Sequence, residues 1–226
     1  MFKSYSMELA GRTLTVDVGR VAKQANGAVL IHYGETVILS TATASDKPRE
    51  GIDFFPLSVD YEEKMYAVGK IPGGFNKREG KASEHATLTS RVIDRPMRPL
   101  FPKDYRNDVT LNNLVMSVDP ECNPEIPAML GSSIATCISD IPFDGPCAAT
   151  QMGLIDGELV VNPTMAQRVV SDLQLTVAST REKVIMIEAG ANEVPDDKMI
   201  EAIYKAHEVN QEIIRFFDGI IAECGK

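Results

Sequence analysis

Hydrophobic and polar positions alternate through the first part of the chain, and this alternation predicts β-strands. The alternating segments are rich in β-branched residues and are separated by glycines and short turns. They cover residues 5–11, 12–19, 27–34 and 36–45, and a further strand approached through Pro56 is expected within 53–69. The order of these segments predicts a meander of neighbouring strands.

A loop and a helix are expected next. Residues 70–81 pack three glycines and a proline into a polar run, which no regular element tolerates. Ser83 is a candidate N-cap for the helix that follows. Pro96 disfavours helical geometry at Arg95, so this helix should end near Asp94.

The second half of the chain contains strand patterns and two further helix patterns. A strand is expected at 108–119, a helix at 125–141, a hairpin at 146–163 that turns at Asp156 and Gly157, and strands at 172–180 and 183–190. A long amphipathic helix should start at Pro195 and end at Gly225. With no linker or low-complexity segment, a single α+β domain is the simplest expectation.

Composition limits the class of protein. The 226 residues are 44% hydrophobic and 24% charged, as in ordinary globular proteins. The first residues hold no apolar core of signal-peptide length, and no apolar run reaches membrane-spanning length, so we expect a cytoplasmic protein without a membrane partner. The four cysteines include no C-x-x-C pair, which favours free thiols and no metal site.

Positive charge is concentrated in one segment of an otherwise acidic chain. The net charge is −9, yet residues 64–106 hold ten Lys and Arg against four Asp and Glu. The loop offers Lys70, Lys77, Arg78 and Lys81 beside Phe75. Basic side chains can bind the phosphates of single-stranded nucleic acid, and an aromatic ring can stack on one of its bases. This combination favours a site for single-stranded nucleic acid. A solvated loop with Phe75 folded back onto the protein is the alternative.

Three arginines follow the loop. Arg91, Arg95 and Arg98 are spaced by four and three residues, which would place them on one side of a continuous helix. Because Pro96 and Pro99 argue against continuity, the residues alone leave two roles open. The arginines could satisfy the last helix carbonyls, or they could bind an anion. His85 lies beside the loop with no evident partner in the sequence.

Longer strings carry a family resemblance: "FFPLSVDYEEKMYAVGKIPGGF", "KREGKASE", "SRVIDRPMRPLFP", "NPEIPAMLGSSIA" and "IPFDGP". They resemble the N-terminal part of the bacterial polynucleotide phosphorylases, over essentially the whole chain. The resemblance implies an RNase PH-like (ribosomal protein S5 domain 2-like) two-layer α+β fold, with a mixed sheet and packed helices. Residues 1–226 would be the first RNase PH-like domain of a longer chain. A helical linker, a second core domain and KH and S1 modules would complete that chain.

The resemblance also implies a function. Such proteins are ring-shaped homotrimers that shorten single-stranded RNA from its 3′ end with inorganic phosphate, release nucleoside diphosphates and so turn over mRNA. Mg²⁺ or Mn²⁺ assists the full-length enzyme, and we expect neither ion to be bound by this domain. Expected partners are RNA, the second RNase PH-like domain of the same chain, the other subunits of the trimer and an RNA-degrading complex.

Site residues follow by position in the family pattern. Phe75, Asn76, Lys77 and Arg78 match the loop that grips RNA at the ring entrance. Many relatives carry a second aromatic where Asn76 stands, so stacking should be weaker here. Arg91, Arg95 and Arg98 match arginines implicated in holding RNA, which favours their anion-binding role.

The resemblance predicts that this domain holds no catalytic residues. Asp172 matches one carboxylate of the catalytic pattern, but Gln174 stands at the second carboxylate and Thr176 at the lysine. Where the pattern has phosphate-binding serines, the chain reads Glu121, Cys122, Asn123 and Pro124. We therefore expect an RNA-capturing, ring-forming domain that is inactive alone. The alternatives are a stand-alone RNase PH-like enzyme and a purely structural trimerisation domain.

Overall fold

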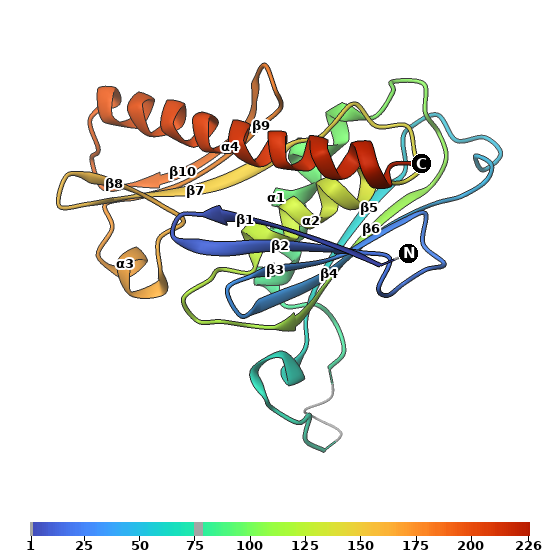
Figure 1. Ribbon diagram of the computed structural model, residues 1–226, viewed down its shortest axis with the longest axis horizontal. Helices are drawn as coiled ribbons and strands as arrows, with labels where there is room; N and C mark the ends of the chain where they lie inside the picture. The colour runs from blue at the N-terminus through green and yellow to red at the C-terminus, as the bar shows by residue number, and fades with distance from the viewer. Residues whose placement is uncertain (1, 75–78) are drawn as a thin grey trace.

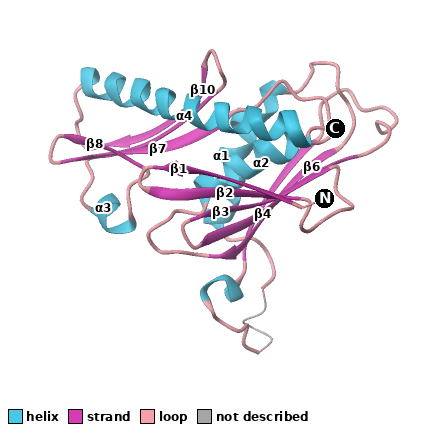
Figure 2. Cartoon of the chain, in the orientation of Figure 1, coloured by secondary structure: helices cyan, strands magenta, loops and turns pink. Residues whose placement is uncertain are grey.

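A computed structural model describes residues 2–74 and 79–226, and Figure 1 shows their arrangement. The described residues form two β-sheets, with helices packed between and over them (Figures 1 and 2). The α+β class and the mixed sheet expected from the sequence are confirmed.

The larger sheet begins with the expected meander. Four strands pair antiparallel in chain order: β1 (Lys3–Leu9), β2 (Arg12–Val18), β3 (Gly27–Tyr33) and β4 (Thr36–Ala44). β6 (Val109–Ser117) pairs antiparallel with β4, and β5 (Leu57–Glu63) pairs parallel with β6 at the sheet edge. A parallel pair needs a long crossover connection, and α1 (Glu84–Met97) lies within it.

Alternation along these strands produces the core. Leu14 and Val16 of β2, Ile31 of β3 and Ile38 of β4 are each 0% exposed, while most of the neighbouring positions are at least partly exposed. Burying one apolar side chain of this size contributes about 1.5–3 kcal/mol. The period-2 pattern of the sequence therefore reports which face of the sheet is covered.

α2 (Glu125–Cys137) is the central helix, and every residue from 126 to 136 is buried. It contacts β3 and β4 of the larger sheet and β7 of the smaller one, so it lies between the two sheets. Two glycines permit this close approach. A Cβ at Gly131 would overlap the Ser40 side chain, and a Cβ at Gly27 would overlap the Ala135 carbonyl.

α2 ends at Cys137, earlier than the expected end at residue 141. The Ser139 hydroxyl donates to the Thr136 carbonyl at 2.6 Å and accepts the Ile141 N–H at 3.1 Å. A serine that bonds the backbone locally competes with continued helix, which explains the early end.

The smaller sheet has the strand order β10-β9-β7-β8. Its strands are β7 (Ala148–Ile155), β8 (Glu158–Val161), β9 (Leu173–Ser179) and β10 (Val184–Ala191). β7 and β8 form the expected hairpin, with Asp156 at φ 49° and Gly157 at φ 81° in its turn. Two consecutive positive φ angles are the geometry of a tight type I′ hairpin turn.

α4 (Asp196–Cys224) covers β7 and β9 of the smaller sheet, as the red helix of Figure 1 shows. It begins one position after the expected start at Pro195 and ends before Gly225, as expected. Buried Asn210 joins the helix to the sheet, because its amide donates to the Val177 carbonyl at 3.1 Å and to Ser179 Oγ at 2.8 Å.

The sequence interpretation missed α3 (Met165–Val169). Thr164 and Gln167 form a reciprocal capping box at its start. The T-x-x-Q spacing was a readable signal for a helix N-terminus, but a helix this short lacks an apolar period.

Candidate nucleic-acid interface

Residues 64–74 and 79–83, which flank the segment predicted to grip RNA, extend from the body of the molecule between β5 and α1 (Figure 1). Phe75, Asn76, Lys77 and Arg78 lie outside the described residues. At the base of the loop, the Glu79 carboxylate accepts the Met65 N–H. This bond joins the start and the end of the loop.

α1 carries the three arginines beyond the loop. Ser83 Oγ accepts the Ala86 N–H at 3.0 Å, so the predicted N-cap is confirmed. The predicted end near Asp94 is wrong, since the helix continues through Pro96 to Met97 and the Arg98 N–H still donates to the Asp94 carbonyl. Proline removes one helical hydrogen bond, and burial of Pro96 and Met97 against the core offsets that loss.

Arg91, Arg95 and Arg98 therefore lie on one helical run, but they differ in their partners. Arg98 donates to both carboxylate oxygens of Asp94, at 3.0 and 2.7 Å, and to the carbonyls of Phe55 and Leu57, at 3.2 and 3.1 Å. Arg95 pairs with Glu188 of β10 at 3.2 Å. The side chains of Arg95 and Arg98 are thus engaged in contacts within the protein.

Arg91 is exposed, and within residues 2–74 and 79–226 its side chain has no hydrogen bond or ion pair. It borders a shallow cleft of about 340 Å³, together with Leu57, Ser90, Asp94 and Arg98. Lys81 lies nearby in the chain and is also exposed. Of the three arginines on this helical run, Arg91 is nearest the loop, and its side chain is available to an incoming anion.

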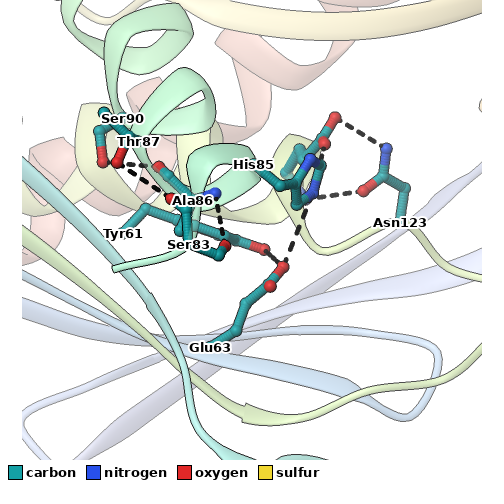
Figure 3. A network of polar contacts seen from close by, with 9 residues as sticks. Tyr61, Glu63, Ser83, His85, Ala86, Thr87, Ser90 and Asn123 are labelled. Atoms are coloured by element: carbon teal, nitrogen blue, oxygen red, sulfur yellow. Dashed lines mark hydrogen bonds and ion pairs between the residues drawn. The ribbon is translucent and has the colours of Figure 1, made fainter. Parts of the chain in front are cut away.

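His85 occupies the centre of a polar network at the base of the loop (Figure 3). Its Nε2 lies 3.2 Å from Glu125 Oε1 and 3.7 Å from Glu63 Oε1. The Tyr61 hydroxyl donates to Glu63 at 2.9 Å, and burial raises the pKa of Tyr61 far above its ordinary value. The network joins the end of β5, the start of α1 and the start of α2.

A cleft of about 400 Å³ lies beside this network, between α1, the start of α2 and strands β7, β9 and β10. Glu125, Gln174 and Thr176 line it. Gln174 and Thr176 come from one segment that the sequence interpretation compared with catalytic motifs, and Glu125 directly follows the other, which ends at Pro124, so the fold brings both regions to one place. Asp172, the acid that matches the catalytic pattern, is exposed and does not line the cleft.

The chemistry of the cleft differs from that of a metal-dependent site. Gln174 and Thr176 offer an amide and a hydroxyl where a metal or phosphate needs charged groups. No group of three His, Cys, Asp or Glu side chains that could hold a metal ion occurs in the described part of the chain. Burial raises the pKa of Cys122 to about 11, so its thiol stays protonated at neutral pH.

Sequence reasoning named His85, Gln174 and Thr176, but it did not find the other polar groups of this cleft. The partners of His85 lie on distant segments, and Glu188 and Thr89 were not singled out. Gln151 left one signal, because it is a polar residue within the apolar strand 148–155. A buried polar side chain in an apolar run requires a partner.

Comparison with known proteins places this architecture in a family. Residues 10–142 match the family model described as 3′ exoribonuclease family, domain 1, and residues 145–209 match domain 2 of the same family. The chain belongs to the 3′ exoribonuclease family. One hydrophobic core crosses the boundary between the two matches, because it contains Ile31 and Ile134 as well as Ala148 and Ala178.

Curated relatives resemble the whole chain. It is 82% identical over 226 residues to the polyribonucleotide nucleotidyltransferase of Lachnoclostridium phytofermentans, covering 100% of the chain and 32% of the relative. It is 64% identical to the protein of the same name from Ruminiclostridium cellulolyticum, with the same coverage. The chain thus spans about a third of the length of these relatives.

A solved structure supports the fold. The crystal structure of rice (Oryza sativa) Rrp46 matches with a TM-score of 0.69 at 13% identity, covering 98% of this chain and 94% of that one. The RNase PH-like fold implied by the family resemblance is confirmed. Across the described residues, no helix has the length and apolarity needed to cross a membrane.

Proposed function

We propose that this chain is the RNA-guiding, non-catalytic first RNase PH-like domain of a phosphate-dependent 3′-to-5′ exoribonuclease. The observation that carries the proposal is its 82% identity, over all 226 residues, to about a third of a polyribonucleotide nucleotidyltransferase. In this proposal residues 1–226 are one domain, and the chemistry that releases nucleoside diphosphates occurs elsewhere in the full-length protein.

The proposed RNA path runs from the loop onto α1. Phe75, Asn76, Lys77 and Arg78 make the first contacts, by stacking and by phosphate binding. Arg91 continues the path, since it is exposed beside a cleft and has no partner among the described residues. Arg95 and Arg98 contribute positive potential, although Arg95 must leave Glu188 and Arg98 must leave Asp94 to bind phosphate directly.

Two features support the non-catalytic role. Gln174 and Thr176 cannot supply the charges that a phosphate nucleophile and a metal ion need. The acidic cleft residues Glu125 and Glu188 would repel phosphate. Inorganic phosphate and Mg²⁺ or Mn²⁺ are therefore assigned to the full-length enzyme, and this domain is proposed to bind neither.

Assembly completes the proposal. The second RNase PH-like domain of the same chain and two further subunits would close a homotrimeric ring in the cytoplasm, and an RNA-degrading complex is a further proposed partner. Three loops presented together would raise the apparent affinity of a weak single site.

Binding of a fluorescent single-stranded RNA at two salt concentrations tests the RNA path. Arg91→Ala should weaken binding and reduce the salt slope, because one phosphate contact is lost. Arg215→Ala is the matched control, since Arg215 is also exposed on a helix but lies on α4. Equal affinity of both variants would contradict the path. Diphosphate release by this chain with phosphate and Mg²⁺ would contradict the non-catalytic role.

A purely structural role is the second candidate, favoured by the engagement of Arg95 and Arg98 with acids. Replacing Lys77 and Arg78 together by alanine distinguishes the two roles. The RNA-guiding role requires weaker RNA binding at an unchanged melting temperature. A lower melting temperature at unchanged affinity would favour the structural role.

A further inference from the structure

The cleft between α1 and β9 contains two buried polar side chains without protein partners. Gln151 is 2% exposed and Thr89 is 4% exposed, and both line the cleft. Within the described residues, neither the Gln151 carboxamide nor the Thr89 hydroxyl makes a hydrogen bond, although the Gln151 backbone bonds Asn162. Their polar atoms are not among the fully buried unpaired atoms of the described residues, so they remain accessible from the cleft and can form hydrogen bonds with a molecule bound there.

The charges of the cleft argue against an anion. None of the described residues that line it is a lysine or an arginine. Its two carboxylates already have nitrogen partners, because Glu125 Oε1 lies 3.2 Å from His85 Nε2 and Glu188 pairs with Arg95 at 3.2 Å. A phosphate in the cleft would be repelled by two carboxylates and would find no unpaired cation to neutralise its charge. An uncharged polar ligand avoids both the repulsion and the cost of burying an unpaired charge.

The walls and the polar groups suit a flat heteroaromatic ring. Leu88, Val92, Ile126 and Met129 supply apolar surface, and the volume of about 400 Å³ lies within the range of small-molecule sites. A glutamine carboxamide can donate and accept in one plane, as in its bidentate pairing with adenine, and a carboxylate accepts from an exocyclic amine. Gln151 and Gln174 bring two such carboxamides to the cleft.

We propose that this cleft binds the base of a nucleoside that carries an exocyclic amino group, such as adenosine. The base can arrive as a free nucleoside or as one nucleotide of single-stranded RNA, and the same groups recognise it in both cases. The cleft is separate from the path over the loop and Arg91. The inference rests on the cleft alone and does not depend on the phosphorolytic activity of the full-length protein.

The Met129 methyl group offers a local measurement, because Met129 lines the cleft and is 5% exposed. In the 226-residue chain labelled with ¹³C-methyl methionine, adenosine should shift the Met129 resonance saturably. Met116, on β6 and outside the cleft, is the internal control and should not move. Inosine, which has a keto group in place of the amine, should bind about tenfold more weakly.

Further probes separate the sources of the base and exclude an anion site. Adenosine diphosphate should bind no tighter than adenosine, and inorganic phosphate should leave Met129 unchanged. A short oligoadenylate that shifts Met129 at lower concentration than adenosine would identify RNA as the source, and equal or weaker action would identify the free nucleoside.

Variants complete the test. Gln174→Ala should weaken adenosine binding by about three- to tenfold, since one hydrogen bond is lost, while Gln24→Ala in an exposed loop should not. Gln151→Met should abolish the preference for adenosine over inosine. If the Gln151→Met variant does not fold, adenosine binding by the Gln174→Ala variant provides the test, because Gln174 is exposed. The proposal is overturned if Met129 does not respond to adenosine, if adenosine and inosine bind alike, or if phosphate competes.

Discussion

The Arg98 guanidinium binds both carboxylate oxygens of Asp94, one helical turn earlier, at 3.0 and 2.7 Å. The same group donates to the carbonyls of Phe55 and Leu57, where the chain enters the edge strand β5. Arg98 therefore links α1 to the edge of the larger sheet, in addition to any contact with RNA.

Arg98→Ala should lower the free energy of unfolding by about 1–2 kcal/mol, mainly through the two lost carbonyl bonds, because an exposed ion pair contributes little. Urea unfolding measures this change. Arg98→Lys should recover little, since an ammonium lacks the planar fork. Arg91→Ala should leave stability unchanged, and an equal loss for both alanine variants would contradict the link.

Asn210 should contribute more to the free energy of unfolding than Arg98 does. It is 0% exposed, accepts from Thr150 Oγ1 at 2.6 Å and donates to Val177 and Ser179. Asn210→Ala should cost about 2–4 kcal/mol, because it leaves buried groups unpaired and opens a cavity. A double-mutant cycle with Thr150→Val should show coupling above about 0.5 kcal/mol, and strict additivity would argue against a shared network.

Two glycines within helices should respond to alanine with opposite signs. Gly131→Ala should destabilise the chain by about 1–3 kcal/mol, because the new Cβ overlaps Ser40 across the contact of α2 with β4. Gly219→Ala on α4 should stabilise it by about 0.5–1 kcal/mol, since nothing lies within 4 Å and alanine favours helix. Thermal unfolding of both variants measures the difference. Stabilisation by Gly131→Ala would show that α2 packs less closely.

Asp17 gives a pH-dependent prediction. Burial by itself raises the pKa of Asp17, but hydrogen bonds from Ser4 and Arg20 and the charge of His32 outweigh it and leave the pKa below its ordinary value. Such a carboxylate stabilises the fold above its unfolded pKa of about 3.9, and the contribution is lost as the pH falls through the lower folded value.

Asp17→Asn should therefore lower stability at pH 7, and the difference from the parent chain should shrink below about pH 4. Urea unfolding at pH 7 and pH 3 measures both quantities. Asp104→Asn in an exposed turn is the matched control. A difference that stays constant between the two pH values would show that lost packing, and not the charge of Asp17, is responsible.

Local patterns were sufficient for most of the fold. The meander, the hairpin at Asp156 and the long helix to Gly225 each depend on turn chemistry or on a hydrophobic period within a short window. The helix through Pro96 was missed because burial of that turn compensates for the proline, and burial is a tertiary quantity. The helix ending at Cys137 depends on the Ser139 hydroxyl, a single side chain that the period does not report.

By itself, the sequence determined where most strands and helices form, that positive charge gathers around the loop and α1, and which family the chain resembles. The tertiary structure decided which of those charges are engaged: Arg95 meets Glu188 of β10, while Arg91 has no partner among the described residues. It also decided that Gln151 and Gln174 face one cleft. Propensity and periodicity act over a few residues, whereas ion pairs and buried polar groups depend on segments that only folding brings together.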